Sequence, residues 1–314
     1  MNSIAIQTEG LSRSFGSLVA VDRLSLQVPS GSIFGFLGPN GSGKTTTIRL
    51  LLGLLAPTSG YARVLGYDIR TAADAIRQSS GALLEHNGLY QRLSAENNLD
   101  FYAEVWHMPV DERKARIKEL LTHLDLWDRR AEIVGRWSRG MQQKLAVARA
   151  LLHHPSLVFM DEPTAGLDPL AAAALHTDLA ALAAREGVTI FMTTHNLAEA
   201  EKLCQQVAVI RKGRLLATGL LDELRLQAGG PRLEILGSSF SDQALAALKS
   251  RPEVLDLSLQ DNRLLINLGQ SAETAPLVSL LVNNGVQVDE VRKGKANLEE
   301  VFISLMDEDA EVER

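Results

Sequence analysis

The fold of this chain is decided by the stretch Gly38-Pro39-Asn40-Gly41-Ser42-Gly43-Lys44-Thr45. It matches the phosphate-binding pattern G-x-x-x-x-G-K-[ST]. A short apolar run at residues 33–37 precedes it and predicts a buried strand, and a helix is predicted to follow over about residues 45–55. Because glycines let the loop backbone curl, its N–H groups can point at phosphate oxygens, beside the positive end of the helix dipole. This setting disfavours a chance match by an ordinary glycine-rich turn, and it predicts a nucleotide site.

The residues of this loop and of the following helix have separate expected roles. Lys44 is expected to neutralise the β- and γ-phosphates, and the Thr45 hydroxyl is expected to ligate Mg²⁺. The other residues of this segment that are predicted to bind the nucleotide are Gly38, Pro39, Asn40, Gly41, Ser42, Gly43 and Thr46.

A second apolar run, at residues 157–160, predicts a buried strand that ends in Asp161-Glu162. Asp161 is expected to hold Mg²⁺ through its waters. Glu162 lies one step further on, where a carboxylate can polarise an attacking water, so it is assigned the role of general base. The alternative is an acidic pair that merely starts a helix beside Pro163, and the phosphate loop in the same chain disfavours it.

Strands that alternate with helices along the chain predict an α/β fold with a mostly parallel sheet and an antiparallel β edge. A mostly helical block, residues 87–154, is inserted in this first domain, which covers residues 1–226. Residues 227–314 show the order β-α-β-β-α-β, which is typical of a small ferredoxin-like α+β domain. We expect this second domain to be accessory or regulatory.

Composition limits the function classes. The chain has 314 residues, 46% of them hydrophobic and 22% charged, which is typical of globular proteins. Its formal charge is −6, so no basic excess indicates nucleic acid as the main partner. Cys204 is the only cysteine, which excludes a disulfide within the chain and suits a reducing cytosol. The N-terminus lacks the basic start and apolar stretch of a signal peptide. No apolar run approaches the roughly 20 residues that span a bilayer.

One further segment suggests the family, Trp137-Ser138-Arg139-Gly140-Met141-Gln142-Gln143. It resembles the L-S-G-G-Q signature of ATP-binding cassette (ABC) ATPases. The order of phosphate loop, signature, D-E-P-T, A-G-L-D and T-T-H resembles that family over residues 1 to about 225. Trp137, Arg139 and Met141 depart from the common signature. The form W-S-R-G-M-Q-Q is similar to the Y-S-K-G-M-Q-Q variant of drug-resistance and sodium-extruding subunits that serve ABC-2-type permeases.

The resemblance implies that two copies pair head to tail and complete each other's sites. The segment Ser138, Arg139, Gly140 and Met141 then contacts the ATP held by the partner subunit. Ser138 also reads as an ordinary helix N-cap. Asp168, in Ala165-Gly166-Leu167-Asp168, resembles the loop that communicates between the paired sites, and it equally reads as a turn before a helix.

Three more site residues come from the resemblance. His195 resembles the family's switch histidine, whose neutral imidazole can donate to the γ-phosphate and orient the attacking water. Phe15 matches the aromatic residue that stacks on adenine, although a core phenylalanine is the open alternative. Glu85 stands where the family usually has a glutamine that ligates Mg²⁺. A carboxylate can still be a ligand there, but it adds negative charge near the γ-phosphate.

The resemblance therefore predicts the ATP- and Mg²⁺-dependent subunit of an ABC-2-type exporter, on the cytoplasmic face of the cell membrane. Its expected partners are a second such subunit, in a homodimer, and a separate integral membrane permease, with no nucleic acid. One alternative is a soluble ABC ATPase of translation or DNA repair. The single cassette and the lack of a coiled coil between Lys44 and Ser138 disfavour it. Another is a module that binds nucleotide without turnover, which intact Glu162 and His195 disfavour.

Overall fold

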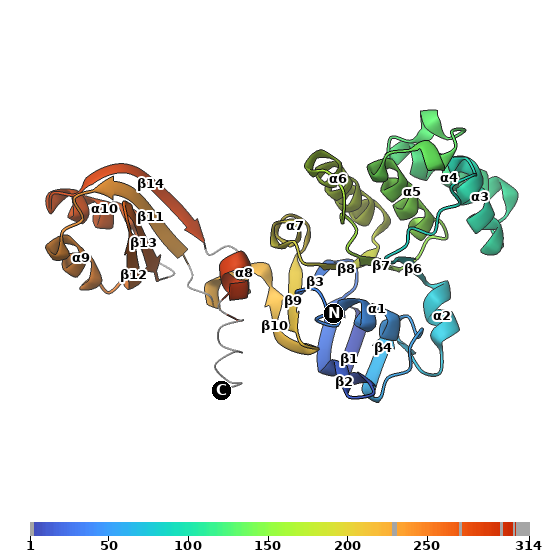
Figure 1. The fold of residues 1–314 in the computed structure, drawn as a ribbon, viewed down its shortest axis with the longest axis horizontal. Helices are drawn as coiled ribbons and strands as arrows, with labels where there is room; N and C mark the ends of the chain where they lie inside the picture. Colours follow the sequence, from blue (N-terminus) through green and yellow to red (C-terminus); the bar gives the residue numbers. More distant parts are fainter. Residues whose placement is uncertain (1–2, 228–230, 270–271, 296–297, 304, 306–314) are drawn as a thin grey trace. The chain divides into compact units, whose positions relative to one another are not determined.

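A computed structural model describes residues 3–227, 231–269, 272–295, 298–303 and 305 (Figure 1). The contacts within the chain divide it into two compact units, Met1–Thr218 and Gly219–Arg314. The domain boundary predicted after residue 226 lies within the second unit, in α8 (Leu221–Gln227). In the described residues no helix is both long and apolar enough to cross a membrane.

The first unit is built on a six-stranded sheet with the strand order β10-β9-β3-β8-β7-β6. Its strands are β3 (Ile33–Leu37), β6 (Ser80–Leu83), β7 (Leu157–Asp161), β8 (Thr189–Thr194), β9 (Gln206–Arg211) and β10 (Arg214–Leu220). From β9 to β6 every neighbouring pair is parallel, which confirms the predicted sheet. All residues of β3, β7 and β8 are buried, as expected for strands covered on both faces.

The β6 strand has no strand pattern in its sequence, and its packing gives the reason. The strand contains Gly81, where a Cβ atom would lie 2.0 Å from the backbone oxygen of Ala150 in α5 (Arg139–Leu151). Close approach of the helix thus requires glycine there, and the strand lacks the β-branched and aromatic side chains that mark strands in a sequence.

The N-terminal strands form a second, antiparallel sheet with the order β2-β1-β4-β5. Its strands are β1 (Ile4–Phe15), β2 (Leu18–Pro29), β4 (Ser59–Val64) and β5 (Tyr67–Asp68). Alternating apolar residues predict strands only over residues 4–8 and 24–28, and both observed strands extend well beyond these ranges. The register of β1 against β2 shifts at Gly10, which has a φ of +57°. Such a bulge interrupts the alternation of side chains by which a strand is recognised.

The α1 helix (Lys44–Leu51) packs between the two sheets, and its Ile48, Leu50 and Leu51 belong to the same core cluster as Phe34 and Phe36 of β3. It ends earlier than predicted, because Gly53 takes a φ of +65° just beyond its end.

The remaining helices of this unit are α2 (Ala73–Gln78), α3 (Ala95–Val105), α4 (Val110–His123), α6 (Pro169–Glu186) and α7 (Leu197–Leu203). Figure 1 shows α3 to α6 on one side of the main sheet and the antiparallel sheet on the other.

A buried ion pair ties the inserted helices to α6. Arg116 of α4 is 3% exposed and donates hydrogen bonds to both carboxylate oxygens of Glu186, over 3.0 and 2.6 Å. It also donates to the backbone oxygen of Leu151, over 2.8 Å. Burial raises the pKa of Glu186, but the guanidinium groups of Arg116 and Arg185 together more than offset this, so the pKa lies below its ordinary value. A buried guanidinium needs such partners, so this contact fixes how α4 and α5 meet the end of α6.

The second unit contains a β-α-β-β-α-β domain whose strands lie in the order β12-β13-β11-β14, with every neighbouring pair antiparallel. Its elements are β11 (Pro231–Ser238), α9 (Asp242–Lys249), β12 (Val254–Gln260), β13 (Arg263–Leu268), α10 (Thr274–Asn283) and β14 (Gln287–Lys295). Leu233, Ile235 and Ile266 form its core with Leu248 of α9 and Leu277 of α10. This arrangement confirms the ferredoxin-like fold.

Candidate active site

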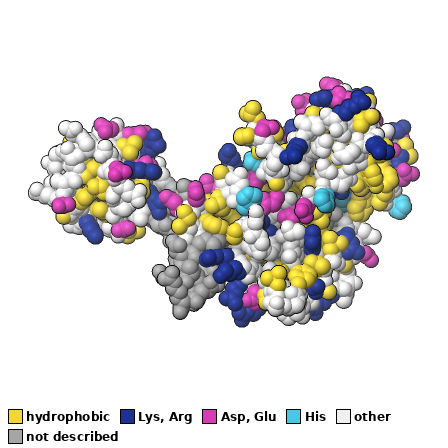
Figure 2. Space-filling view, viewed as in Figure 1, with side chains coloured by type: hydrophobic (Ala, Val, Ile, Leu, Met, Phe, Trp, Pro, Cys, Tyr) yellow, Lys and Arg dark blue, Asp and Glu magenta, His cyan; other side chains and the backbone are white. Residues whose placement is uncertain are grey.

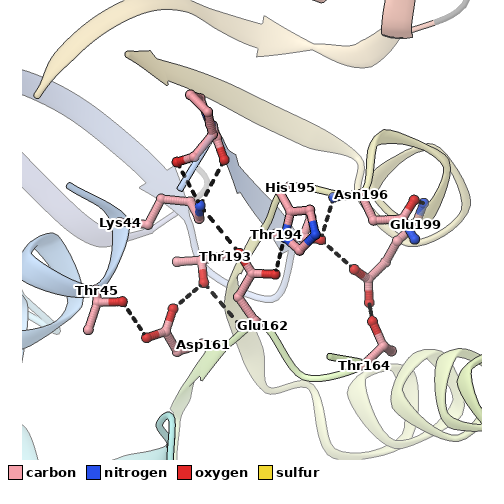
Figure 3. A network of polar contacts seen from close by, with 12 residues as sticks. Lys44, Thr45, Asp161, Glu162, Thr164, Thr193, Thr194, His195, Asn196 and Glu199 are labelled. Carbon is pink, nitrogen blue, oxygen red and sulfur yellow. Dashed lines mark hydrogen bonds and ion pairs between the residues drawn. The ribbon is translucent and has the colours of Figure 1, made fainter. Parts of the chain in front are cut away.

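A cavity of about 850 Å³ opens beside the glycine-rich loop, and its volume lies within the range of small-molecule sites. The predicted site residues that line it are Phe15, Asn40, Gly41, Gly43, Lys44, Thr45, Thr46, Glu85, Asp161, Glu162 and His195. Three of these, Asp161, Glu162 and His195, stand at the carboxyl ends of β7 and β8 or just beyond them, and Lys44 begins α1 after the loop that follows β3 (Figure 3). Ligands of open parallel sheets bind at this edge.

Glycines shape the loop for a close approach. At Gly43, φ is +106°, and an added Cβ atom would lie 2.3 Å from the backbone oxygen of Ala20. At Gly38 an added Cβ atom would lie 2.3 Å from the backbone oxygen of Ile210. Neither position can hold a side chain without moving the backbone, so the curl of the loop depends on glycine.

Lys44 is 6% exposed and lies at the centre of the loop. Its Nζ donates to the backbone oxygens of Gly38 (2.7 Å) and Pro39 (3.1 Å) and lies 3.3 Å from Oε1 of Glu162. The ammonium group is therefore held by the loop and by the carboxylate that follows β7.

Thr45 and Asp161 meet although 116 residues separate them in the sequence. The Thr45 hydroxyl donates to Oδ2 of Asp161 over 2.6 Å, and the hydroxyl of Thr193, in β8, donates to Oδ1. Asp161 is 7% exposed, so its carboxylate is fixed from both sides. A hydroxyl and a carboxylate next to a phosphate cradle are the oxygen donors that Mg²⁺ prefers, and these residues therefore fit that ion.

Glu162 links Lys44 to His195. Its Oε2 lies 2.5 Å from Nδ1 of His195, while its Oε1 faces Lys44 (Figure 3). Its backbone has a φ of 51°, a conformation that a residue with a side chain adopts at an energetic cost. The backbone N–H of Glu162 donates to the backbone oxygen of Thr193, which holds the chain in this conformation. The strained backbone of Glu162, directly after β7, therefore directs the carboxylate into the cavity.

The contact with Glu162 assigns the tautomer of His195. A carboxylate accepts, so Nδ1 of the imidazole carries the proton. A neutral His195 then offers only an acceptor at Nε2, which suits orientation of a water. To donate to a γ-phosphate, the ring has to release Glu162 or bind a second proton.

Apolar side chains line the end of the cavity near β1 and β2. Phe15 is 44% exposed, Leu18 is 66% exposed and Val19 is 46% exposed, and all three line the cavity. The guanidinium of Arg13 lies 4.5 Å from the centre of the Phe15 ring and donates to the backbone oxygen of Ala56 over 2.8 Å. Phe15 is therefore not a core residue, which was the alternative interpretation of its sequence position.

Asp168 and the predicted partner-contacting residues Ser138, Arg139, Gly140 and Met141 do not line the cavity. Ser138 caps α5 by accepting from the backbone N–H of Met141 over 3.3 Å, which confirms the predicted cap. Asp168 caps α6 by accepting from the N–H groups of Leu170 and Ala171. An added Cβ atom on Gly140 would lie 3.0 Å from Cβ of Ala171, so the starts of α5 and α6 lie side by side.

The structure adds residues that the sequence did not single out. Gln143 lines the cavity and donates to the backbone oxygen of Pro163 over 2.6 Å, and Thr193 orients Asp161. Thr193 could have been identified from the sequence, because its hydroxyl stands at the end of an apolar strand. Gln143 gave no signal beyond its place in the signature segment, because polar residues are common on helix surfaces.

Comparisons with known proteins agree with this geometry. Residues 21–165 match the sequence pattern of the family described as ABC transporter. The bacitracin transport ATP-binding protein BcrA of Bacillus licheniformis is 34% identical, over 97% of this chain and 98% of its own length. The daunorubicin resistance ATP-binding protein DrrA3 of Streptomyces coeruleorubidus is 33% identical, over 99% of each. The chain belongs to the ABC transporter family.

A solved ATP-binding subunit of an ABC transporter also resembles this ABC protein, with a TM-score of 0.64 and 30% identity. The match covers 72% of this chain and 93% of that one. The predicted family, the P-loop ABC fold and the ATPase activity are therefore confirmed. This ABC protein binds and hydrolyses ATP.

Proposed function

We propose that this ABC protein is the ATP-hydrolysing subunit of an exporter and drives a separate ABC-2-type permease from the cytoplasmic face of the membrane. The observation that carries the proposal is the contact of Glu162 with both Lys44 and His195 at the wall of the phosphate-loop cavity. The relatives named for bacitracin transport and daunorubicin resistance support a role in transport of such compounds. The W-S-R-G-M-Q-Q form of the signature supports export rather than import.

The nucleotide occupies the cavity with its base at the apolar end and its phosphates at the loop. Phe15 stacks on the base. Lys44, already aimed into the loop by the oxygens of Gly38 and Pro39, neutralises the β- and γ-phosphates. Arrival of the phosphates draws Lys44 from Glu162, and this frees one oxygen of that carboxylate.

The residues that would hold Mg²⁺ are Thr45 and Asp161, whose oxygens lie 2.6 Å apart in a hydrogen bond. The ion supplies charge neutralisation for the phosphates when bound. Glu85 lines the same cavity and is the third proposed ligand. Its carboxylate is a less suitable Mg²⁺ ligand than the neutral glutamine of other family members, because its negative charge is repelled by nearby γ-phosphate oxygens.

Hydrolysis depends on the pair formed by Glu162 and His195. Glu162 accepts a proton from the attacking water as general base. His195 holds Glu162 through Nδ1–H and orients the same water through Nε2. Both groups belong to this chain, so the step needs no residue from elsewhere for proton transfer.

A second copy completes the site. Ser138, Arg139 and Asp168 are exposed, and the starts of α5 and α6 that carry them share one face. The positive end of the α5 dipole, with the exposed cation Arg139 beside it, suits a phosphate of a facing subunit. ATP held between two copies closes a homodimer, and hydrolysis reopens it.

The permease docks near α3. Hydrophobic side chains gather over α3 at the right-hand edge of Figure 2, and those of Tyr90, Phe101 and Val105 are 46%, 40% and 56% exposed. The ring centres of Tyr90 and Phe101 lie 4.9 Å apart, so they form one aromatic surface. An exposed apolar surface of this kind fits a cytosolic helix of a membrane protein. Co-purification of a polytopic membrane protein with the full chain, lost on Phe101→Glu, tests this part.

The central test is Glu162→Gln in the full chain. The amide keeps the shape but cannot accept the proton, so turnover is expected to fall by at least ~100-fold while ATP binding persists. The variant should also accumulate as an ATP-dependent dimer in size-exclusion chromatography. Turnover equal to that of the unmodified protein would refute the assignment of the base, and a permanent monomer would refute the paired site.

A further inference from the structure

Behind the pair formed by Glu162 and His195 lies a buried carboxylate that does not line the cavity. Glu199 of α7 is 2% exposed. Its Oε1 accepts from the hydroxyl of Thr164 over 2.7 Å and lies 3.0 Å from Nε2 of His176. Its Oε2 accepts from the hydroxyl of Thr194 over 2.5 Å. Because a carboxylate only accepts, His176 donates as well, and Glu199 joins three separate elements.

Two of these elements carry the proposed catalytic groups. Thr194 ends β8 and immediately precedes His195. Thr164 lies in the turn that connects Glu162 to Asp168, where the N–H of Ala165 donates to the oxygen of Glu162. Figure 3 shows Glu199 between Thr164 and Thr194, on the side away from Lys44.

A simple capping role does not account for this arrangement. Asn196 caps α7, and a glutamate three residues later usually returns a bond to the cap's own N–H. Here the N–H of Asn196 donates to the hydroxyl of Thr194 over 2.9 Å, and that hydroxyl donates to Glu199. The carboxylate thus acts on the segment of His195 through Thr194, not on the helix start.

Removing the carboxylate leaves two hydroxyls and an imidazole without an acceptor in a water-poor place. The two chain segments that it joins are those that aim Glu162 and His195 toward each other. A displacement of about 1 Å in reacting groups can slow a reaction by about 100-fold. Loss of the carboxylate is therefore expected to act on the chemical step and not on the nucleotide pocket.

We propose that Glu199 is a positioning residue for ATP hydrolysis: its buried carboxylate holds the Thr164 turn and the Thr194 strand end in register, and so keeps His195 and Glu162 paired. The inference rests on the roles proposed above for Glu162 and His195. It predicts that variants of this network change kcat and leave the affinity for ATP unchanged.

The test measures kcat, the Kd for ATP and Tm for the full chain carrying Glu199→Ala, Glu199→Gln or Thr164→Val. The alanine variant is expected to lose ~10- to 100-fold in kcat with Kd within about twofold. The glutamine variant keeps the oxygen that accepts from Thr164, so it should recover most of that loss. Combining Thr164→Val with Glu199→Ala should add little to the loss from Glu199→Ala alone, because both remove the same contact.

The matched control is Glu186→Gln, which alters a carboxylate that binds Arg116 in the same unit and touches neither Thr164 nor Thr194. It should lower Tm and leave kcat unchanged. The inference fails if Glu199→Ala keeps the kcat of the unmodified protein, or if its Kd for ATP rises by as large a factor as its kcat falls. It also fails if Glu186→Gln lowers kcat as much as Glu199→Ala does. Glu162→Gln, assayed alongside, separates the two hypotheses. If that variant is inactive while Glu199→Ala is normal, only the inference fails; if Glu162→Gln is active, the proposed base fails.

Discussion

Replacing Phe15 by alanine tests how the cavity holds the base of the nucleotide. The guanidinium of Arg13 lies 4.5 Å from the ring centre on one face, and Arg13 is itself fixed by the oxygen of Ala56. The ring is 44% exposed, so it is available to a stacked base while it remains anchored from behind. Alanine substitution of a stacking aromatic costs about 1–3 kcal/mol. At about 1.4 kcal/mol per factor of ten, the Kd for ATP should rise by about 5- to 150-fold.

Calorimetric or fluorescence titration of the full chain with ATP measures this change. Phe15→Trp should keep or improve the affinity, because the larger ring still stacks. At saturating ATP the kcat of Phe15→Ala should equal that of the unmodified protein, since the ring touches no proton-transferring group. An unchanged Kd would refute the stacking role, and a normal Kd with lowered stability would indicate a packing role instead.

Two other predictions concern the phosphate loop and the half-buried His153. Gly43→Ala should abolish measurable ATP binding, because its Cβ atom would lie 2.3 Å from the oxygen of Ala20. Gly187 also has a positive φ, +63°, but an added Cβ atom there would meet no other atom within 4 Å. Gly187→Ala should therefore lower the free energy of unfolding by only about 1 kcal/mol and leave ATP binding intact. Similar Kd values for ATP in the two variants would contradict this prediction. Burial lowers the pKa of His153 from 6.5 to about 4. The unfolded chain therefore binds this proton more readily, and the free energy of unfolding should fall by about 2 kcal/mol as the pH drops from 6.5 toward 4. His153→Gln, which keeps a donor for the oxygen of Ser80, should lack this loss in denaturant titrations at the two pH values, and parallel losses would exclude the histidine as the cause.

The phosphate loop, the strand ending in Asp161 and the ferredoxin-like order of the second unit were all predictable. Each depends on residues that are close in the sequence: an apolar run, a glycine-rich turn, or a hairpin. The same holds for Ser138, whose role as a cap depends on the next three residues. Local patterns of this kind determine backbone conformation directly, so a single sequence suffices to identify them.

Elements that depend on distant partners were missed or shortened. β6 uses Gly81 to admit α5, and the register shift near Gly10 conceals the length of β1. Glu199 was not predicted as a site residue, because nothing in its own segment reveals that Thr164 lies beside it. In each case the decisive neighbour comes from another part of the chain.

The sequence by itself predicted a nucleotide site at the loop that ends in Lys44 and Thr45, and it determined that Asp161 ends a buried strand, with Glu162 directly after it. Only the tertiary structure decided that Glu162 contacts both Lys44 and His195, that Phe15 is exposed at the cavity, and that Glu199 accepts hydrogen bonds from both Thr164 and Thr194. The physical reason is that loop conformation follows from local sterics and hydrogen bonds. The meeting of side chains from the start of α1 and the ends of β7 and β8 follows from strand register and helix packing, which contacts between distant parts of the chain set.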